Sequence, residues 1–491
     1  MRADWRVEFT GRILLLGCGA VSRCLQPLLL RHVAMNFGEL TIMDRVDSRT
    51  GAESALARGA RFVRHRLTRQ NYPHTLAREL GPGDVLINLT WDVDSRDLLW
   101  WCHRNGVRYL DTSLETWASE GDSTTTAADR TTYRRHGKLY ELGARLDPAG
   151  PTAVVEHGAN PGLVSHLTKR ALHDVATAVL ADRDAGSGPA VDDDGALESA
   201  LADGDHARIA MTTGTRAIHI SERDTQRGEI PKDVDEFVNT WSVKGFYEEA
   251  TAPAELGWGT HERELPPLAV THETGPRNQI YLARTGMSTW VRSWVPSTGP
   301  MLGMMISHGE TFTISDGLTV RDPSGLPIYR PTVHFAYLPS DAALASLHEF
   351  RMRGYRTQSR QRIVDDEIVA GSDELGVLLL GHGRNGWWTG TSLDIHEARS
   401  LVPGQNATTL QVAASALGAL RWMLLHPNRG LRVPDDLDHE EVLAAAEPYL
   451  GECPSVPTGW TPFDGADDRL DAPVRSSDED DPWQFGNVLV R

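Results

Sequence analysis

Residues 12–22 read Arg12-Ile13-Leu14-Leu15-Leu16-Gly17-Cys18-Gly19-Ala20-Val21-Ser22, and they indicate the architecture of the N-terminal part of the chain. The apolar run before Gly17 predicts a buried strand, and apolar residues recur at helical spacing after Gly19. Gly17 permits a tight turn, and Gly19 lets the backbone approach a pyrophosphate bound by the N–H groups of the helix N-terminus. A strand, a glycine-rich turn and a helix in this order are typical of a dinucleotide-binding domain.

An acidic residue stands where this kind of domain needs one. A second strand is predicted over residues 40–43, and Asp44 follows it, 25 residues after Gly19. We expect a carboxylate there to bind the ribose 2′-hydroxyl and to repel a 2′-phosphate, which favours NAD over NADP. The match is partial, because Ser22 holds the third glycine position and Arg45 adjoins the acid. The alternative interpretation is a plain strand–turn–helix.

The first 160 residues alternate apolar strands with helical segments. Strands are predicted over residues 12–16, 40–43, 61–63, 84–89, 108–110 and 152–155. This alternation predicts a Rossmann-type, doubly wound parallel sheet in an α/β domain spanning residues 1–160. Ligands bind at the carboxyl ends of such strands. The residues expected to contact the cofactor are Gly17, Gly19, Ala20, Val21, Asp44, Asn88, Thr90, Thr112, Ser113, Asn160 and Pro161.

The pattern changes in the second half of the chain. Strands are predicted over residues 217–220, 279–283, 289–295, 304–314 and 333–338. They indicate an α+β substrate domain with a mixed or antiparallel sheet over residues 161–395. A stretch rich in Asp, Gly and Ala, residues 183–206, is interpreted as a surface loop. Residues 407–425 predict a long apolar helix, and the segment 396–491 is expected to pack back on the first domain.

The composition excludes several classes of function. The net charge of −18 argues against nucleic acid or an anionic membrane as a partner and favours a cationic ligand, although many proteins are acidic only for solubility. The absence of an apolar run of about 18 residues, of a secretory layout and of a cysteine framework predicts a cytoplasmic protein. Histidines and cysteines lack metal-ligand spacing, so no metal is expected. Only four basic residues are lysines, which leaves few candidates for a Schiff base.

Three places carry residues that could bind an amine. Glu222 and Asp224 share a strand face with apolar residues, and a carboxylate on such a face needs a cation or a ligand. His308 and Glu310 are interpreted in the same way, as a pair facing inward from a predicted strand. Trp241 offers the best aromatic surface for an ammonium group. The alternatives are an ion pair with arginine, a hydrogen-bonded core histidine and a core tryptophan.

Longer motifs resemble bacterial homospermidine synthases, which are related to saccharopine reductases, over essentially the whole chain. The motifs are Asn160-Pro161-Gly162, His219-Ile220-Ser221-Glu222-Arg223-Asp224-Thr225-Gln226-Arg227, Phe237-Val238-Asn239-Thr240-Trp241-Ser242-Val243, Pro253-Ala254-Glu255-Leu256-Gly257-Trp258-Gly259-Thr260, Asp373-Glu374-Leu375-Gly376-Val377-Leu378-Leu379, Asp481-Pro482-Trp483-Gln484-Phe485 and Asn487-Val488-Leu489-Val490-Arg491. The resemblance implies a two-domain enzyme that holds NAD through its whole cycle. A homodimer is expected.

The resemblance also implies a role for individual residues. Trp241 matches the family's cation–π tryptophan over the bound amine. The other expected catalytic residues are Glu222, His308, Glu310, Asn160 and Asp373, and the expected substrate-binding residues are Asp92, Glu115 and Glu249. Asp92, Glu115, Asn160 and Asp373 match the residues near the inner amine and the nicotinamide. The chain departs from the family pattern at Ser22, at Lys244, where an acid would suit a cationic path better, and in the 183–206 stretch.

The implied reaction joins two putrescine molecules into homospermidine and releases ammonia. Hydride transfer to NAD gives an imine at the carbon bearing the inner amine, a second putrescine replaces the ammonia, and the retained NADH reduces the new imine. Attack needs a neutral amine, so a carboxylate or His308 must accept a proton. Two alternatives stay open: a saccharopine-type dehydrogenase of an amino acid or polyamine with net cofactor turnover, and a non-catalytic NAD-binding sensor.

Overall fold

The glycine-rich stretch forms the predicted strand, turn and helix. β2 (Ile13–Leu16) is buried at every residue, and α1 (Ala20–His32) begins directly after Gly19. The protein is represented by a computed structural model, which describes residues 5–117, 126–184, 195–464 and 481–490. The strand, turn and helix predicted over residues 12–22 are confirmed, and both interpretations of this stretch share these elements.

β2 lies inside a seven-stranded sheet in which every pair of neighbours is parallel. The order across the sheet is β24-β8-β7-β6-β2-β4-β5. Its other strands are β4 (Leu40–Asp44), β5 (Arg61–Arg64), β6 (Val85–Asn88), β7 (Arg108–Asp111), β8 (Ala153–Val154) and β24 (Leu431–Arg432). The chain goes from β2 to β4 on one side and returns to β6 on the other. Such a reversal opens a ligand crevice at the carboxyl ends of β2 and β6.

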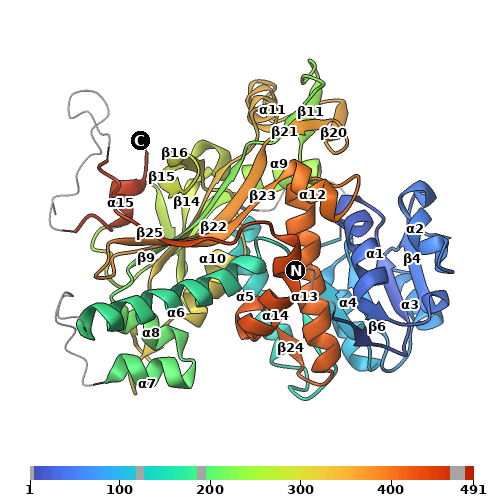
Figure 1. Ribbon diagram of the computed structural model, residues 1–491, viewed down its shortest axis with the longest axis horizontal. Coiled ribbons are helices and arrows are strands. Elements are labelled where there is room, and N and C mark those ends of the chain that lie inside the picture. The colour runs from blue at the N-terminus through green and yellow to red at the C-terminus, as the bar shows by residue number, and fades with distance from the viewer. Residues whose placement is uncertain (1–4, 118–125, 185–194, 465–480, 491) are drawn as a thin grey trace.

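Helices cover this sheet and join it to the rest of the molecule. The crossovers contain α2 (Glu53–Leu56), α3 (Tyr72–Glu79), α4 (Ser95–Arg104) and α5 (Thr132–Gly143), and a short pair of strands, β1 (Val7–Glu8) and β3 (Val33–Ala34), lies beside α1. The predicted apolar helix is α13 (Ala407–Leu425), which contacts α1 and also β22 of the second sheet. Figure 1 shows α13 between the blue N-terminal domain and the second sheet.

The second domain is built on a ten-stranded mixed sheet. Its main path runs β13-β14-β12-β19-β9-β22-β23-β25, with β15 and β16 attached beside β19. The strands are β9 (Ala217–Asp224), β12 (Pro253–Gly257), β13 (Ala269–Thr271), β14 (Gln279–Thr285), β15 (Trp290–Val295), β16 (Gly299–Met304), β19 (Thr332–Leu338), β22 (Ser372–Leu380), β23 (Gly386–Asp394) and β25 (Ser455–Thr458). β9 is parallel to β19 and antiparallel to β22, which confirms the expected mixed sheet.

The remaining helices and strand pairs surround this sheet. The helices are α6 (Leu163–Asp184), α7 (Ala196–Asp203), α8 (His206–Thr213), α9 (Val243–Thr251), α10 (Glu310–Gly317), α11 (Asp341–Met352), α12 (Ile395–Leu401), α14 (His439–Ala446) and α15 (Phe485–Val488). The strand pairs are β10 (Arg227–Gly228) with β21 (Ile368–Ala370), β11 (Glu236–Asn239) with β20 (Arg360–Ile363), and β17 (Val320–Arg321) with β18 (Pro327–Tyr329). None of the described helices is both long and apolar enough to span a membrane.

Two secondary-structure predictions were wrong. The strand predicted over residues 304–314 ends at Met304, and α10 begins at Glu310. α10 is buried from Glu310 to Ser315, so it lacks the polar face that would reveal a helix in the sequence. The loop predicted over 183–206 contains α7, whose Leu197 and Ala200 are buried; residues 185–194 lie outside the described residues.

The C-terminal segment divides between the two domains, whereas residues 396–491 were expected to pack on the first. α13 and β24 belong with the parallel sheet, but β25 pairs with β23 of the second sheet. Gln484 also contacts the second domain, because its side chain donates to the carbonyl of His261 at 2.9 Å. The boundaries at residues 160 and 395 stay predictions.

Candidate active site

The turn at the carboxyl end of β2 has the geometry that a dinucleotide needs. Gly17 has φ +89°, and a Cβ atom at this position would lie 2.7 Å from the carbonyl oxygen of Leu89. A Cβ on Gly19 would meet no atom within 4 Å, and the N-terminus of α1 has no side-chain cap and no acid in its first turn. Ala20 and Val21 begin this helix. An open glycine backbone before unblocked helix N–H groups fits a pyrophosphate.

Asp44 ends β4 and points back to the glycine turn. Its carboxylate accepts a hydrogen bond from the N–H of Cys18 at 2.7 Å and one from the N–H of Val46 at 3.0 Å. Arg45 turns to the other side, where it pairs with Asp92 at 3.4 Å and lies 4.9 Å from the ring centroid of Trp91. Arg45, whose position next to Asp44 left the preference between NAD and NADP open, is therefore already paired with an acid.

The other predicted cofactor residues follow the neighbouring strands. Asn88 ends β6 and accepts hydrogen bonds from the backbone N–H of Thr90 at 3.2 Å and from its hydroxyl at 2.6 Å. Thr112 and Ser113 follow β7, and Asn160 and Pro161 follow β8. Carboxyl ends of parallel strands meet at one edge, so the fold brings these residues to the same side of the sheet.

Two acids end the central strand of the second domain. Glu222 and Asp224 lie on the face of β9 that carries buried isoleucines, as predicted, and both are buried. The amide of Asn160 donates to Glu222 at 2.6 Å and so joins the end of β8 to the second sheet. On the neighbouring strands, Tyr337 lies in register with Glu222, and Asp373 in register with Asp224. The sheet therefore brings together Glu222, Asp224 and Asp373, which were all singled out in the sequence.

His308 links two further carboxylates. Its Nε2 lies 3.1 Å from Glu249 on α9, and its Nδ1 lies 3.4 Å from Glu310 at the start of α10. Neither carboxylate oxygen of Glu310 accepts a hydrogen bond from a described residue, although the side chain is fully buried. The same holds for one oxygen of Asp373, whose other oxygen accepts from the hydroxyl of Thr408. Buried carboxylate oxygens without donors call for a bound cation.

The electrostatics of this cluster agree with its geometry. Burial, with smaller contributions from Asp224 and Glu310, raises the pKa of Glu222 to about 8 against the lowering effects of His308 and Asn160. Burial raises the pKa of Asp224 to about 6, and burial together with Glu222 and Asp224 raises the pKa of Asp373 well above its usual value. Burial alone would lower the pKa of His308, but Glu310 and Glu249 hold it well above the ordinary value. The site thus gathers more carboxylates than cations.

Aromatic rings form a wall beside the acids. Trp241 lies in the turn between β11 and α9, and its indole N–H donates to the hydroxyl of Tyr337 at 3.2 Å. Phe246 lies 5.5 Å from Trp241, and Tyr337 stacks on Phe335 at the same distance between centroids. Phe335 in turn lies 4.2 Å from the His308 ring. Sequence reasoning missed Tyr337, although its alternation with Phe335 in the predicted strand 333–338 could have indicated it.

Two predicted substrate residues lie apart from the buried acids. Asp92 pairs with Arg45, and Glu115 accepts a hydrogen bond from Ser113 at 2.9 Å. Burial, with smaller contributions from Glu248 and Glu249 of α9, raises the pKa of Glu115 to about 8 against the lowering effects of Ser113 and Arg135. Burial lowers the pKa of Lys244 on α9, and Asp92 and Glu115 both raise it. They therefore lie where α9 approaches the first domain.

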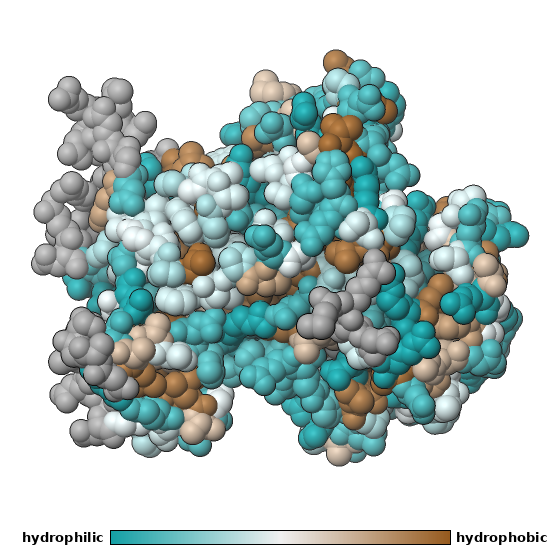
Figure 2. Space-filling view, in the orientation of Figure 1, coloured by the Kyte–Doolittle hydropathy of each residue, from teal (hydrophilic) through white to brown (hydrophobic). Residues whose placement is uncertain are grey.

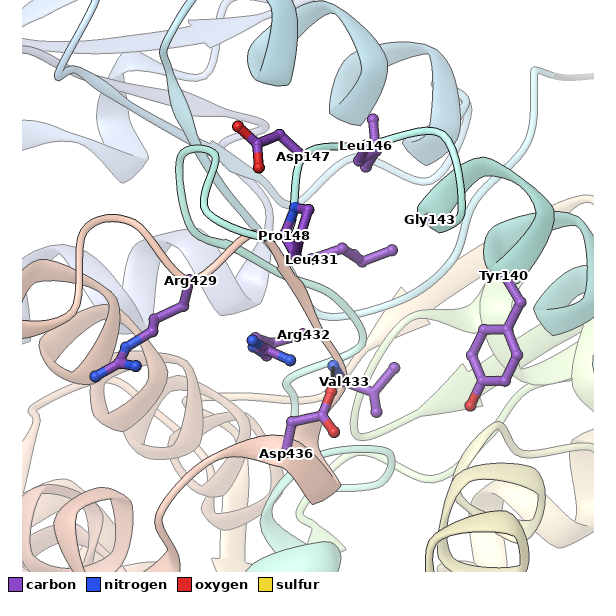
Figure 3. Close-up of a pocket in the computed structure, with 10 residues that line it drawn as sticks. All are labelled: Tyr140, Gly143, Leu146, Asp147, Pro148, Arg429, Leu431, Arg432, Val433 and Asp436. Carbon is purple, nitrogen blue, oxygen red and sulfur yellow. Dashed lines mark hydrogen bonds between the residues drawn. The ribbon is translucent and has the colours of Figure 1, made fainter.

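A groove of about 420 Å³ lies elsewhere, between the end of α5 and β24 (Figure 3). It is lined by Tyr140, Gly143, Leu146, Asp147, Pro148, Arg429, Leu431, Arg432, Val433 and Asp436. The carboxylate of Asp436 accepts a hydrogen bond from the N–H of Val433 at 3.0 Å on this side of the groove. The groove contains none of the predicted site residues, so it is a separate feature.

Comparison with known proteins shows which family this chain belongs to. The family model of the saccharopine dehydrogenase NADP binding domain matches residues 13–154, and that of the saccharopine dehydrogenase C-terminal domain matches residues 158–455. Homospermidine synthase from Blastochloris viridis is 42% identical over 496 residues, with 99% of each chain covered. This chain belongs to the homospermidine synthase family. The homospermidine synthase from Mesorhizobium japonicum is 39% identical, with 99% of this chain and 98% of that protein covered.

A solved member of the family has the same fold. The crystal structure of the homospermidine synthase from Legionella pneumophila, in complex with NAD, matches with a TM-score of 0.87 and 35% identity. The match covers 99% of both chains, so both domains and their arrangement are shared. The description of the first family model mentions NADP, whereas the Legionella enzyme was solved with NAD.

Proposed function

We propose that this protein joins two putrescine molecules into homospermidine, releases ammonia and keeps its NAD throughout. The observation that carries the proposal is the buried cluster of Glu222, Asp224, Glu310 and Asp373 beside the Trp241 wall. The Glu310 oxygen that does not face His308 and one oxygen of Asp373 are buried and lack hydrogen-bond donors among the described residues. Putrescine is a flexible chain with an ammonium group at each end, and it supplies the missing donors and positive charge.

The first domain supplies the cofactor side of the proposed site. The open backbone at Gly19 and the N-terminus of α1 suit the pyrophosphate, and Asp44 suits an unphosphorylated ribose. When bound, NAD accepts a hydride from the amine-bearing carbon of putrescine and returns it to the imine that precedes homospermidine. The pairing of Arg45 with Asp92 supports NAD over NADP, because the guanidinium next to Asp44 in the sequence is engaged with an acid.

The acids and the aromatic wall bind and orient the diamine. We assign the ammonium group near the first domain to Asn160, Glu222 and Asp373, with Asp92 and Glu115 on the path from outside. The indole face of Trp241 favours a cation by about 0.5–2 kcal/mol. Burial strengthens these attractions and excludes water, which would otherwise hydrolyse an imine.

A carboxylate, rather than His308, suits the role of proton acceptor. The attacking amine must lose a proton before it forms a bond to carbon. Two carboxylates hold the pKa of His308 well above the usual value, which favours the protonated imidazole and disfavours it as a proton acceptor. Glu222 has a pKa of about 8, which is close to the working range of a general base. His308 instead fixes Glu249 and Glu310 and moderates their repulsion.

The deciding experiment combines the protein, putrescine and a substoichiometric amount of NAD. We expect homospermidine and ammonia in equal amounts, measured by mass spectrometry and an ammonia assay, over many turnovers per NAD. Product limited to one equivalent per NAD would indicate a dehydrogenase with net turnover. Bound NAD that is never reduced by any diamine would indicate a sensor.

We further propose a homodimer located in the cytoplasm. The four cysteines are free, which suits a reducing compartment. Apolar side chains are exposed on the projecting arm that contains α11, β11, β20 and β21, and they are Ile230, Val234, Met352, Tyr355, Ile363 and Val369. Figure 2 shows apolar patches over this arm. An exposed cluster of this kind is typical of an interface, and light scattering on the purified protein measures the mass directly.

A further inference from the structure

We propose that the buried pair of His136 and Glu156, in the first domain, positions the His308–Glu310 segment of the second. Both are positioning residues, since neither belongs to the acid cluster described above. The inference rests on the proposed function. It adds that residues of the first domain fix the position of His308–Glu310 in the second.

His136 and Glu156 form an ion pair that is buried in the protein. His136 Nε2 lies 2.7 Å from a carboxylate oxygen of Glu156, and the side chains are 0% and 8% exposed. Burial alone would lower the pKa of His136, but Glu156 raises it above the usual value, with further help from the carbonyl of Thr132 and from Glu255. The carboxylate of Glu156 thus favours the protonated form of the His136 imidazole. A buried ion pair is poor evidence for stability, because desolvation opposes the attraction.

The backbone at Glu156 holds the side chain in an unusual direction. Glu156 follows β8 with φ +55°, in the left-handed region that non-glycine residues seldom adopt. Its N–H donates to Asp111 at 2.6 Å, and Asp111 also accepts from the hydroxyl of Tyr109 at 2.7 Å. Strain of this kind persists where the surroundings fix it, commonly at functional sites. Here it directs a carboxylate from the first sheet to the second domain.

Both members of the pair contact the start of α10. A Cβ atom on Gly309 would lie 2.7 Å from both carboxylate oxygens of Glu156, so the carboxylate packs directly on this residue. The ring of His136 stacks on Phe312 with centroids 4.6 Å apart and planes 17° apart. A negative charge at a helix N-terminus is favourable. The pair therefore fixes α10 by its first turn.

Gly309 lies between the two residues that the reaction uses. His308 must reach Glu249 at 3.1 Å on one side and Glu310 at 3.4 Å on the other. A shift of Gly309 would lengthen these contacts and weaken the hold of both carboxylates on the His308 proton. The arrangement of His308 in the second domain thus depends on Glu156 in the first.

The charges that surround the two histidines limit what else can change their protonation. The titratable groups that act on His308 are Glu249 of α9, Glu310 of α10 and Glu222 of β9. Those that act on His136 are Glu156, Glu255 of β12 and Asp316 of α10. Glu156 is not among the groups whose charges act most strongly on His308, so we expect a change at Glu156 to act on His308 mainly through position, and Gly309→Ala, which removes no charge, tests this directly.

The test compares Glu156→Gln, His136→Gln and Gly309→Ala with the wild-type protein loaded with NAD. We expect kcat to fall about 10- to 100-fold with little change in NAD affinity, because a displacement near 1 Å costs that much. We also expect the His308 resonance, observed in ¹³C-histidine-labelled protein and assigned with His308→Gln, to titrate about one pH unit lower. Gly309→Ala keeps both members of the ion pair and alters only the packing of the Glu156 carboxylate on residue 309. This variant therefore tests the inference if Glu156→Gln fails to fold.

The matched control is His426→Gln, which breaks a His–Glu pair with Glu441 of α14 at 3.0 Å. It should leave both kcat and the titration of His308 unchanged. Wild-type kcat and an unshifted His308 titration in Gly309→Ala and the folded pair variants would overturn the inference. The titration needs no turnover, so its outcome is separate from the failure of wild-type protein to make homospermidine, which would count against the proposed function alone.

Discussion

The ammonium nitrogen of Lys244 lies 3.0 Å from the ring centroid of Trp91. Lys244 is on α9, three residues after Trp241, whereas Trp91 follows β6 of the first domain. Burial lowers the pKa of Lys244, while Glu248 and Asp92 raise it. The protein therefore places a cation of its own over an aromatic face at the junction of the domains. A positive charge here opposes the approach of a dication to the acids inside.

Replacing that lysine should improve the affinity for the substrate. In Lys244→Met, we expect KM for putrescine to fall about fivefold at low ionic strength, since one charge–charge interaction near the surface is worth about 1 kcal/mol. The kcat should change little, and the gain should disappear in high salt. Steady-state kinetics at two salt concentrations measure both effects. Lys138→Met on α5 is the control, and an equal change in that variant would refute a local effect.

The aromatic wall predicts a graded response at Trp241. Trp241→Ala should lower kcat/KM for putrescine about 2- to 30-fold more than Trp241→Phe does, because phenylalanine retains an aromatic face. Both variants lose the hydrogen bond to Tyr337, so Tyr337→Phe measures that loss alone. NAD affinity, measured by fluorescence titration, should stay at the wild-type value. Equal losses in Trp241→Ala and Trp241→Phe would mean that the residue only fills space.

Asp44 should set the choice of cofactor. In Asp44→Ala, we expect the preference for NAD over NADP to fall at least about tenfold, because one charge-assisted contact and one repulsion are lost. Arg45→Ala should keep the preference, since Arg45 is paired with Asp92. Binding of both dinucleotides is measured by calorimetry. A loss of NADP binding in Arg45→Ala would show instead that this arginine reaches the phosphate.

The raised pKa of Glu222 predicts how stability depends on pH. The carboxyl group ionises at 4.5 when unperturbed and at about 8 in the folded protein. Between these pH values the folded state holds a proton that the unfolded chain has lost, so the free energy of unfolding falls as pH rises and levels off above about pH 8. Thermal unfolding should show this fall, and Glu222→Gln should reduce it.

Putrescine should act in the opposite direction. A dication binds the ionised carboxylates, so it should raise Tm more at about pH 8.5 than at about pH 6. 1,4-Butanediol, which has the same length without charge, is the matched control ligand. An equal rise in Tm at both pH values would mean that the diamine binds without displacing protons from the acids.

Much of the first domain could be predicted because its signals are local. The strand before Gly17, the helix after Gly19 and the acid at Asp44 each follow from neighbouring residues, and the structure has all three. The helix over residues 407–425 was predicted at its observed bounds for the same reason. By contrast, the sequence near Glu310 resembles a strand, because α10 is buried on all sides and shows no helical period.

The parallel sheet, the cofactor-binding turn and the identity of the acids could be predicted from short stretches of sequence, because periodicity and glycine turns act over a few residues. Which residues contact each other depends on the packing of the two domains. Asn160 reaches Glu222 across 62 positions of the chain, and Glu156 packs on Gly309 across a domain boundary. Such contacts depend on how two sheets are placed against each other, and burial of the shared core, which no short stretch of sequence contains, sets that placement.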